Sequence, residues 1–97
     1  MNIGAPSGSP VRAAAAGEVV YSGDKVAGFG NLILIRHSGG YSTAYAHVQK
    51  PLISRGDKIA AGQAIAGVGK TGNVSTPQLH FEIRKGTKPV NPKTYLP

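Results

Sequence analysis

Residues 31–47 read NLILIRHSGGYSTAYAH, and this stretch decides the fold class of the chain. An apolar run at 31–37 is followed by Ser-Gly-Gly at 38–40 and by an alternating segment at 41–47. A continuous apolar run suits a strand that is covered on both faces. A short glycine-containing turn between two such runs is typical of a β-hairpin. The stretch therefore predicts two antiparallel neighbours in one sheet.

Two segments alternate in a way that, in a strand, places every second side chain on the same face. In the second strand of the hairpin, one face is predicted to carry Tyr41, Thr43, Tyr45 and His47. In the last clear strand, the core face is predicted to carry Leu79, Phe81 and Ile83. The opposite face of that last strand is predicted to carry His80, Glu82 and Arg84.

Glycines separate further strand-like runs at 17–22, 53–59 and 61–69. The first residues, 1–11, and the last, 89–97, are rich in turn-forming residues and are expected to be irregular. No segment shows helical periodicity of useful length. The sequence therefore predicts an all-β fold, with antiparallel strands in two packed sheets or a flattened barrel.

Length and composition exclude several classes of protein. The chain has 97 residues, which suffices for one small domain, and it contains no cysteine. Disulfide scaffolds, thiolate zinc sites and cysteine nucleophiles are therefore excluded. No apolar run approaches the roughly 18 residues of a membrane-spanning helix, and no signal peptide is recognisable.

The charge is strongly positive, because 11 Lys and Arg residues face 4 Asp and Glu residues, for a net charge of +7. Such a balance favours an acidic partner such as nucleic acid, an anionic membrane or a polyanionic wall polymer, and the plain alternative is solubility. The basic residues are scattered, and the aromatic residues are too few to form a stacking platform for bases. Nucleic acid is therefore not expected as a partner.

The histidines carry an incomplete metal signal. Gln78 and His80 are two positions apart, so their side chains share one face of a strand. Two histidines at this spacing would be a strong sign of zinc, because two imidazoles on one face can share an ion. Glutamine is a poor zinc ligand and cannot act as a base, so half of the signal is present.

Other catalytic arrangements find less support. The acidic residues Glu18, Asp24, Asp57 and Glu82 form no evident pair of the kind that a glycosidase needs. No nucleophile-elbow motif is present. The segment GVGKTG at 67–72 lacks the spacing of a phosphate-binding loop, and no helical pattern follows it.

Several motifs occur in a fixed order along nearly the whole chain, namely GSPV at 8–11, GEVV at 17–20, GFGN at 28–31, YSTAYAH at 41–47, GDKI at 56–59, GKTG at 69–72 and QLHFEI at 78–83. Together they resemble the LytM-type (lysostaphin-like) domain of zinc metallopeptidases. The resemblance implies a small antiparallel β-sandwich with a groove over one sheet. It also implies that residues 1–97 are one domain, expected at the C-terminal end of a longer envelope protein.

The resemblance assigns roles to particular positions. The family's zinc is held by two histidines and an aspartate, and two further histidines assist the cleavage of peptide cross-bridges in peptidoglycan. Here His80 stands at a ligand position and His47 at an assisting position, whereas Asn2 replaces the ligand aspartate and Gln78 the other assisting histidine. The remaining ligand histidine would precede residue 1. Because a catalytic zinc needs several protein ligands and a water, we expect no metal, no other cofactor and no peptidase activity, with His80 as a vestige.

Degenerate LytM domains of the NlpD/EnvC type activate periplasmic N-acetylmuramyl-L-alanine amidases during cell division, and the chain looks most similar to the NlpD-like branch. The resemblance thus implies a periplasmic activator whose groove binds an element of a cell-wall amidase and releases its self-blocked active site. Such release requires the activator to prefer the open amidase. The partner-binding groove is predicted to comprise Asn2, Tyr45, His47, Gln78, His80, Glu82 and Arg84.

Other functions remain open from the sequence. The basic charge also suits a peptidoglycan-binding module without control of an amidase. A further alternative is an active zinc-dependent endopeptidase. The GDKI segment at 56–59 also occurs in sugar-phosphotransferase carrier domains, in which two histidines face each other as His47 and His80 could, although residues 79–83 fit the LytM pattern better.

Overall fold

The computed structural model describes residues 1–86 and 88–90. Its elements are the strands β1 (Asn2–Gly4), β2 (Pro10–Arg12), β3 (Gly17–Gly23), β4 (Asn31–Arg36), β5 (Tyr41–Val48), β6 (Lys58–Ile59), β7 (Ala64–Gly67), β8 (Gln78–Lys85) and β9 (Lys88–Val90), with a short 3₁₀ turn, η1 (Ser38–Gly40). Across the described residues, no helix has the length and apolar character needed to cross a membrane.

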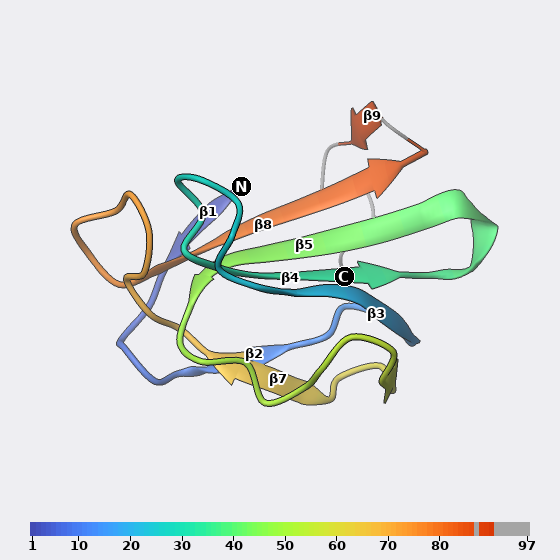
Figure 1. Ribbon diagram of the computed structural model, residues 1–97, viewed down its shortest axis with the longest axis horizontal. Coiled ribbons are helices and arrows are strands. Elements are labelled where there is room, and N and C mark those ends of the chain that lie inside the picture. The colour runs from blue at the N-terminus through green and yellow to red at the C-terminus, as the bar shows by residue number, and fades with distance from the viewer. Residues whose placement is uncertain (87, 91–97) are drawn as a thin grey trace.

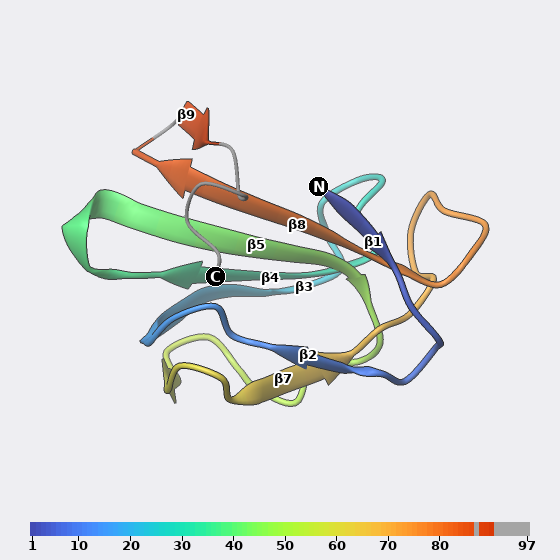
Figure 2. The same ribbon diagram turned by 180° about the vertical axis from the view of Figure 1, so that it is seen from behind.

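The strands form a large antiparallel sheet and a small one that packs against it (Figure 1). In the large sheet the order is β1-β8-β5-β4-β3-β6, and β9 pairs with the other end of β8. The small sheet consists of β2 and β7. Figure 2 shows from behind how β2 and β7 run beneath the long strands. The predicted all-β sandwich is confirmed.

The central hairpin forms as its sequence predicts. β4 and β5 pair along their length, and the Tyr41 carbonyl accepts a hydrogen bond of 2.8 Å from the His37 amide at the turn. β8 then pairs with the free edge of β5. These pairings align Ile33, Tyr45 and Phe81 in one row across the sheet.

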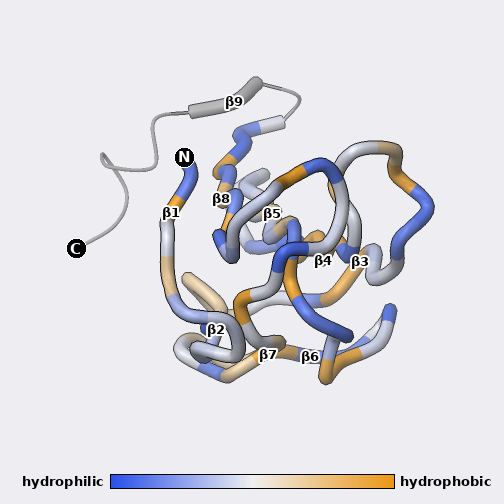
Figure 3. Tube along the Cα trace, turned by 90° about the vertical axis from the view of Figure 1, so that its left-hand side faces the viewer, coloured by the Kyte–Doolittle hydropathy of each residue, from blue (hydrophilic) through white to orange (hydrophobic). Residues whose placement is uncertain are grey.

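The main core lies between the two sheets, where Figure 3 shows apolar segments of both. It takes Ile33, Ile35 and Phe81 from the large sheet and Val11 and Ile65 from the small one, all nearly inaccessible to water. As predicted from the alternation of β8, Phe81 and Ile83 point into this core. Burial of these branched and aromatic side chains is the main stabilising contribution.

The opposite face of the large sheet carries a second apolar cluster. Leu32, Ala44 and Ala46 are buried there, and Phe29 and Leu34 pack against them. This cluster explains why β4 is apolar at successive positions, because both of its faces are covered. The loop between β3 and β4 supplies part of the cover.

Three expectations about regular structure need correction. The segment 1–11 is not irregular throughout, because β1 pairs with the edge of β8 and β2 pairs with β7. These strands are too short to give a periodic signal, and long-range pairing creates them. β9 likewise lies partly within the segment 89–97, of which residues 91–97 lie outside the described part. In the runs 53–59 and 61–69, β6 and β7 are shorter than the runs themselves.

Candidate functional site

A groove of about 280 Å³ crosses the face of the large sheet that is turned away from the main core. Its floor includes Leu32 and Leu34 of β4 and Ala44 of β5. Phe29 and Val26, from the loop between β3 and β4, line it together with polar side chains of β8. The lining therefore combines an apolar floor with one polar wall, an arrangement suited to binding an amphipathic partner.

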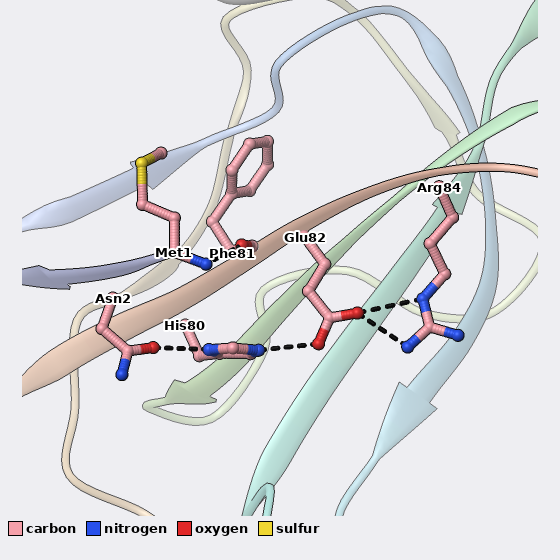
Figure 4. Close-up of polar contacts among 6 residues, drawn as sticks. All are labelled: Met1, Asn2, His80, Phe81, Glu82 and Arg84. Atoms are coloured by element: carbon pink, nitrogen blue, oxygen red, sulfur yellow. Dashed lines mark hydrogen bonds and ion pairs between the residues drawn. The ribbon is translucent and has the colours of Figure 1, made fainter. Parts of the chain in front are cut away.

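The polar wall, formed by His80, Glu82 and Arg84, belongs to a hydrogen-bonded row that begins at Asn2 of β1, a residue outside the groove lining (Figure 4). Asn2 lies opposite His80 in the pairing of the two strands, and its Oδ1 is 2.5 Å from Nδ1 of His80. The other ring nitrogen of His80, Nε2, donates to Oε2 of Glu82 at 2.7 Å. Oε1 of Glu82 accepts from Nε and Nη2 of Arg84 at 2.9 and 2.7 Å.

The carboxylate of Glu82 sits at the centre of this row, and 20% of its side chain is exposed. Its partial burial would by itself raise its pKa, because burial disfavours the charged form. The hydrogen bonds and charges of His80 and Arg84 outweigh that effect, so that the pKa of Glu82 lies below its ordinary value. The row is thus built around an ionised carboxylate.

His47 reaches the groove side through a break in the strand. Asn31 pairs with Val48 and Leu32 with Ala46, so His47 bulges out of the ladder with a φ of 66°. Such a bulge reverses the direction in which a side chain points. The prediction that His47 shares a face with Tyr45 is therefore wrong, because strict alternation ends at this residue.

The ring of His47 packs beside the polar row. Its centroid lies 6.3 Å from that of His80 and 6.4 Å from that of Phe29. Nδ1–H of His47 donates to the Thr71 carbonyl at 2.8 Å, which leaves Nε2 without a hydrogen-bond partner among the described residues. The structure therefore places the rings of His47 and His80 side by side.

Tyr45 does not belong to the groove, so the prediction that it is a groove residue is wrong. It is 1% exposed and lies in the main core, where its ring packs against Phe81 at a centroid distance of 5.3 Å. Its hydroxyl accepts the Ala14 amide at 2.9 Å and is hydrogen-bonded to the Thr43 hydroxyl at 3.0 Å. Burial is the main reason why the pKa of Tyr45 is raised, and these hydrogen bonds oppose the rise. The strand's alternation turns Tyr45 away from the groove.

Gln78 lies at the start of β8, on the same strand face as His80. Its amide Nε2 donates to the backbone carbonyl and the hydroxyl of Thr76, both at 3.4 Å. Of the residues expected in the groove, the structure thus joins Asn2 and the polar side chains of β8 in one row. Gln78 lies apart from that row.

The apolar residues of the site are not among those predicted from the sequence. Leu32 and Leu34 carry a signal, since an uninterrupted apolar strand predicts a second covered face. Val26 and Phe29 lie in a glycine-rich loop and carry none, because their position depends on how the loop folds over the sheet. Within residues 1–86 and 88–90, no three His, Cys, Asp or Glu side chains are placed to share a metal ion.

Comparison with known proteins gives one family. Residues 1–92 match peptidase family M23. Over its whole length, the chain is 47% identical to the uncharacterized lipoprotein YgeR of Escherichia coli K12 and 46% identical to the murein hydrolase activator NlpD of the same strain. It is 43% identical to the cell division protein DipM of Caulobacter vibrioides, again over its whole length. The chain spans 38%, 25% and 17% of these three relatives.

Solved structures agree with this relationship. The catalytic domain of the antimicrobial peptidase lysostaphin from Staphylococcus simulans superposes with a TM-score of 0.89 at 29% identity, over 97% of this chain and 74% of that one. The catalytic domain of the prophage-encoded M23 protein EnpA from Enterococcus faecalis gives a TM-score of 0.87 at 33% identity, over 97% and 75%.

Proposed function

This chain belongs to peptidase family M23, and within that family we propose that it is a non-catalytic LytM domain that activates periplasmic N-acetylmuramyl-L-alanine amidases during cell division. The name of the relative NlpD, a murein hydrolase activator, supports the activating role. The name of the cell division protein DipM supports the process. Several relatives are named as lipoproteins, which supports a place in the cell envelope.

The observation that carries the proposal is the chemistry of the side chains at the position where LytM-type peptidases hold zinc. Asn2 offers a neutral amide oxygen in place of a carboxylate, and it is already hydrogen-bonded to His80. The second nitrogen of His80 is occupied by Glu82. Zinc sites rely on charged or imidazole ligands, so the described residues do not fit a zinc ion. A chain with this donor set is better suited to binding than to hydrolysis.

The groove supplies a surface for that binding. An apolar floor contributes affinity through burial, while a polar wall fixes the orientation of the bound segment. We propose that a segment of the amidase which blocks its own active site binds here. The activator would then shift the amidase toward its open form, to the extent that it binds the open form more tightly.

The test is dye release from labelled peptidoglycan by the chain alone, by a purified periplasmic amidase alone and by both together. The proposal expects release in the mixture to exceed that of the amidase alone, and expects none from the chain alone. Release by the chain alone that stops when a chelator is added would identify a zinc hydrolase instead.

The net charge of +7 favours a second candidate, a peptidoglycan-binding module without control of an amidase. Co-sedimentation with purified sacculi, combined with no effect on the amidase, would support this candidate. Binding that vanishes at high salt would identify the charge as its cause, because salt screens exposed charges.

A further inference from the structure

The polar wall of the groove is connected from end to end, and the connection continues to Asn2 of β1. Asn2, His80, Glu82 and Arg84 form one line of hydrogen bonds, and each of the inner two residues is held on both sides (Figure 4). A residue at one end of such a line can influence the other end without touching it, because hydrogen-bonded networks act as units.

Arg84 is suited to fix the carboxylate at the centre of the line. Its Nε and Nη2 groups, two neighbouring donors on one edge of the guanidinium, both contact Oε1 of Glu82. A planar pair of donors sets the direction of a carboxylate, which a single ammonium cannot do. With Oε1 held in this way, Oε2 is directed at Nε2 of His80, 2.7 Å away.

His80 in turn is hydrogen-bonded at both ring nitrogens, and its ring packs against the ring of Phe29. Its centroid lies 6.0 Å from that of Phe29, which lines the groove from the loop between β3 and β4. The orientation of the His80 ring therefore sets the shape of the groove between its polar wall and that loop.

We infer that Arg84 is a positioning residue, which acts through Glu82 to hold the His80 ring against Phe29 and so keeps the groove in its binding shape. The inference rests on the proposed function for its activity readout. It differs from a direct role, in which the guanidinium would itself bind the partner.

A double-mutant cycle tests whether Arg84 and Glu82 act through one another, because such residues give non-additive effects. The variants are Glu82→Gln, Arg84→Lys and their combination, which keep the size or the charge of the side chain. In the dye-release assay, each single variant should raise the concentration for half-maximal activation about tenfold, as expected for loss of a charge-assisted contact. The double variant should be no worse than Glu82→Gln alone.

Additive effects in the double variant, about a hundredfold by the same reasoning, would overturn the inference in favour of direct binding by Arg84. Arg36→Lys is the matched control. Arg36 pairs with Glu18 at 3.1 Å through a 66% exposed side chain and does not line the groove, so its replacement should leave activation unchanged.

A measurement on the free chain is independent of the activator role. In NMR spectra, nuclear Overhauser contacts between the rings of His80 and Phe29 should weaken in Arg84→Lys and Glu82→Gln and persist in Arg36→Lys. Unchanged contacts in the first two variants would overturn the inference, even if activation falls. If the wild-type chain activates no amidase, the proposed function fails, and the NMR contacts still decide whether Arg84 positions His80.

Discussion

Gly30 and Gly72 touch where the loop before β4 meets the loop before β8. A Cβ atom added to Gly30 would lie 2.4 Å from the backbone nitrogen of Gly72, and one added to Gly72 would lie 2.4 Å from that of Gly30. Neighbouring hydrogen bonds tie the same loops together, including one of 3.1 Å from the Asn31 amide to the Thr71 hydroxyl. This contact holds the loop that carries Phe29 over the groove.

Gly72→Ala should therefore lower the free energy of unfolding by at least about 3 kcal/mol, because the methyl group would clash with backbone atoms that cannot move aside. The matched control is Gly62→Ala. Gly62 has nearly the same φ, +78° against +79°, and no atom lies near its Cβ position. Gly62→Ala should lower the free energy of unfolding by only about 1–2 kcal/mol, the cost of placing a side chain in the left-handed backbone region. Equal losses in urea denaturation would contradict the steric account.

Tyr45→Phe should cost about 1–3 kcal/mol of stability, because the Ala14 amide and the buried Thr43 hydroxyl would both lose their acceptor. Tyr21→Phe is the control, since the Tyr21 hydroxyl accepts the Lys25 amide at an exposed position where water can replace it. If Tyr45→Phe weakened amidase activation and left stability intact, the placement of this residue in the core would be wrong.

Stability should also fall at alkaline pH in a way that depends on Tyr45. Burial raises the pKa of Tyr45 above its ordinary value of 10.0, so the unfolded chain releases this proton first as the pH rises. The contribution is fully present below pH 10 and is lost above it. As the pH rises above 10, the loss of stability measured by urea denaturation should be smaller in Tyr45→Phe than in Tyr21→Phe. Equal slopes would refute the expectation.

Zinc should not stabilise the chain. A ligand that binds only the folded state raises the melting temperature, and the rise grows with the logarithm of the ligand concentration above its Kd. Because Asn2 and His80 are hydrogen-bonded to each other and Glu82 occupies the second nitrogen of His80, we expect no change in melting temperature with added zinc or with a chelator. A melting temperature that keeps rising with the zinc concentration, and that no longer does so in His80→Ala, would establish a metal site here.

Activation should depend on the apolar part of the groove. Val26 lines the groove and is 38% exposed, so Val26→Asp would place a charge against an apolar floor. We expect at least a tenfold higher concentration for half-maximal activation, about 1.4 kcal/mol. Leu52 is 71% exposed and does not line the groove, and its amide donates a hydrogen bond to the carbonyl of Ile65 in β7. Leu52→Asp should therefore leave activation unchanged. Equal responses of the two variants would place the binding surface elsewhere.

The sequence by itself determined the architecture wherever a pattern is local. The apolar run at 31–37 and the turn at 38–40 specify the central hairpin, and the alternation of Phe81 with His80 and Glu82 specifies which face of β8 meets the core. These assignments hold because the period of a strand fixes the direction of each side chain from its neighbours.

The tertiary structure alone decided the features that depend on contacts between distant segments. The three-residue strand β1 forms because it pairs with β8, and only this pairing brings Asn2 to His80. The bulge at His47 reverses a side chain that periodicity would send into the core, whereas the same periodicity carries Tyr45 there. A repeating pattern cannot reveal where the pattern breaks. Here the break is stabilised by hydrogen bonds that His47 donates to the carbonyls of Phe29 and Thr71, residues of other loops.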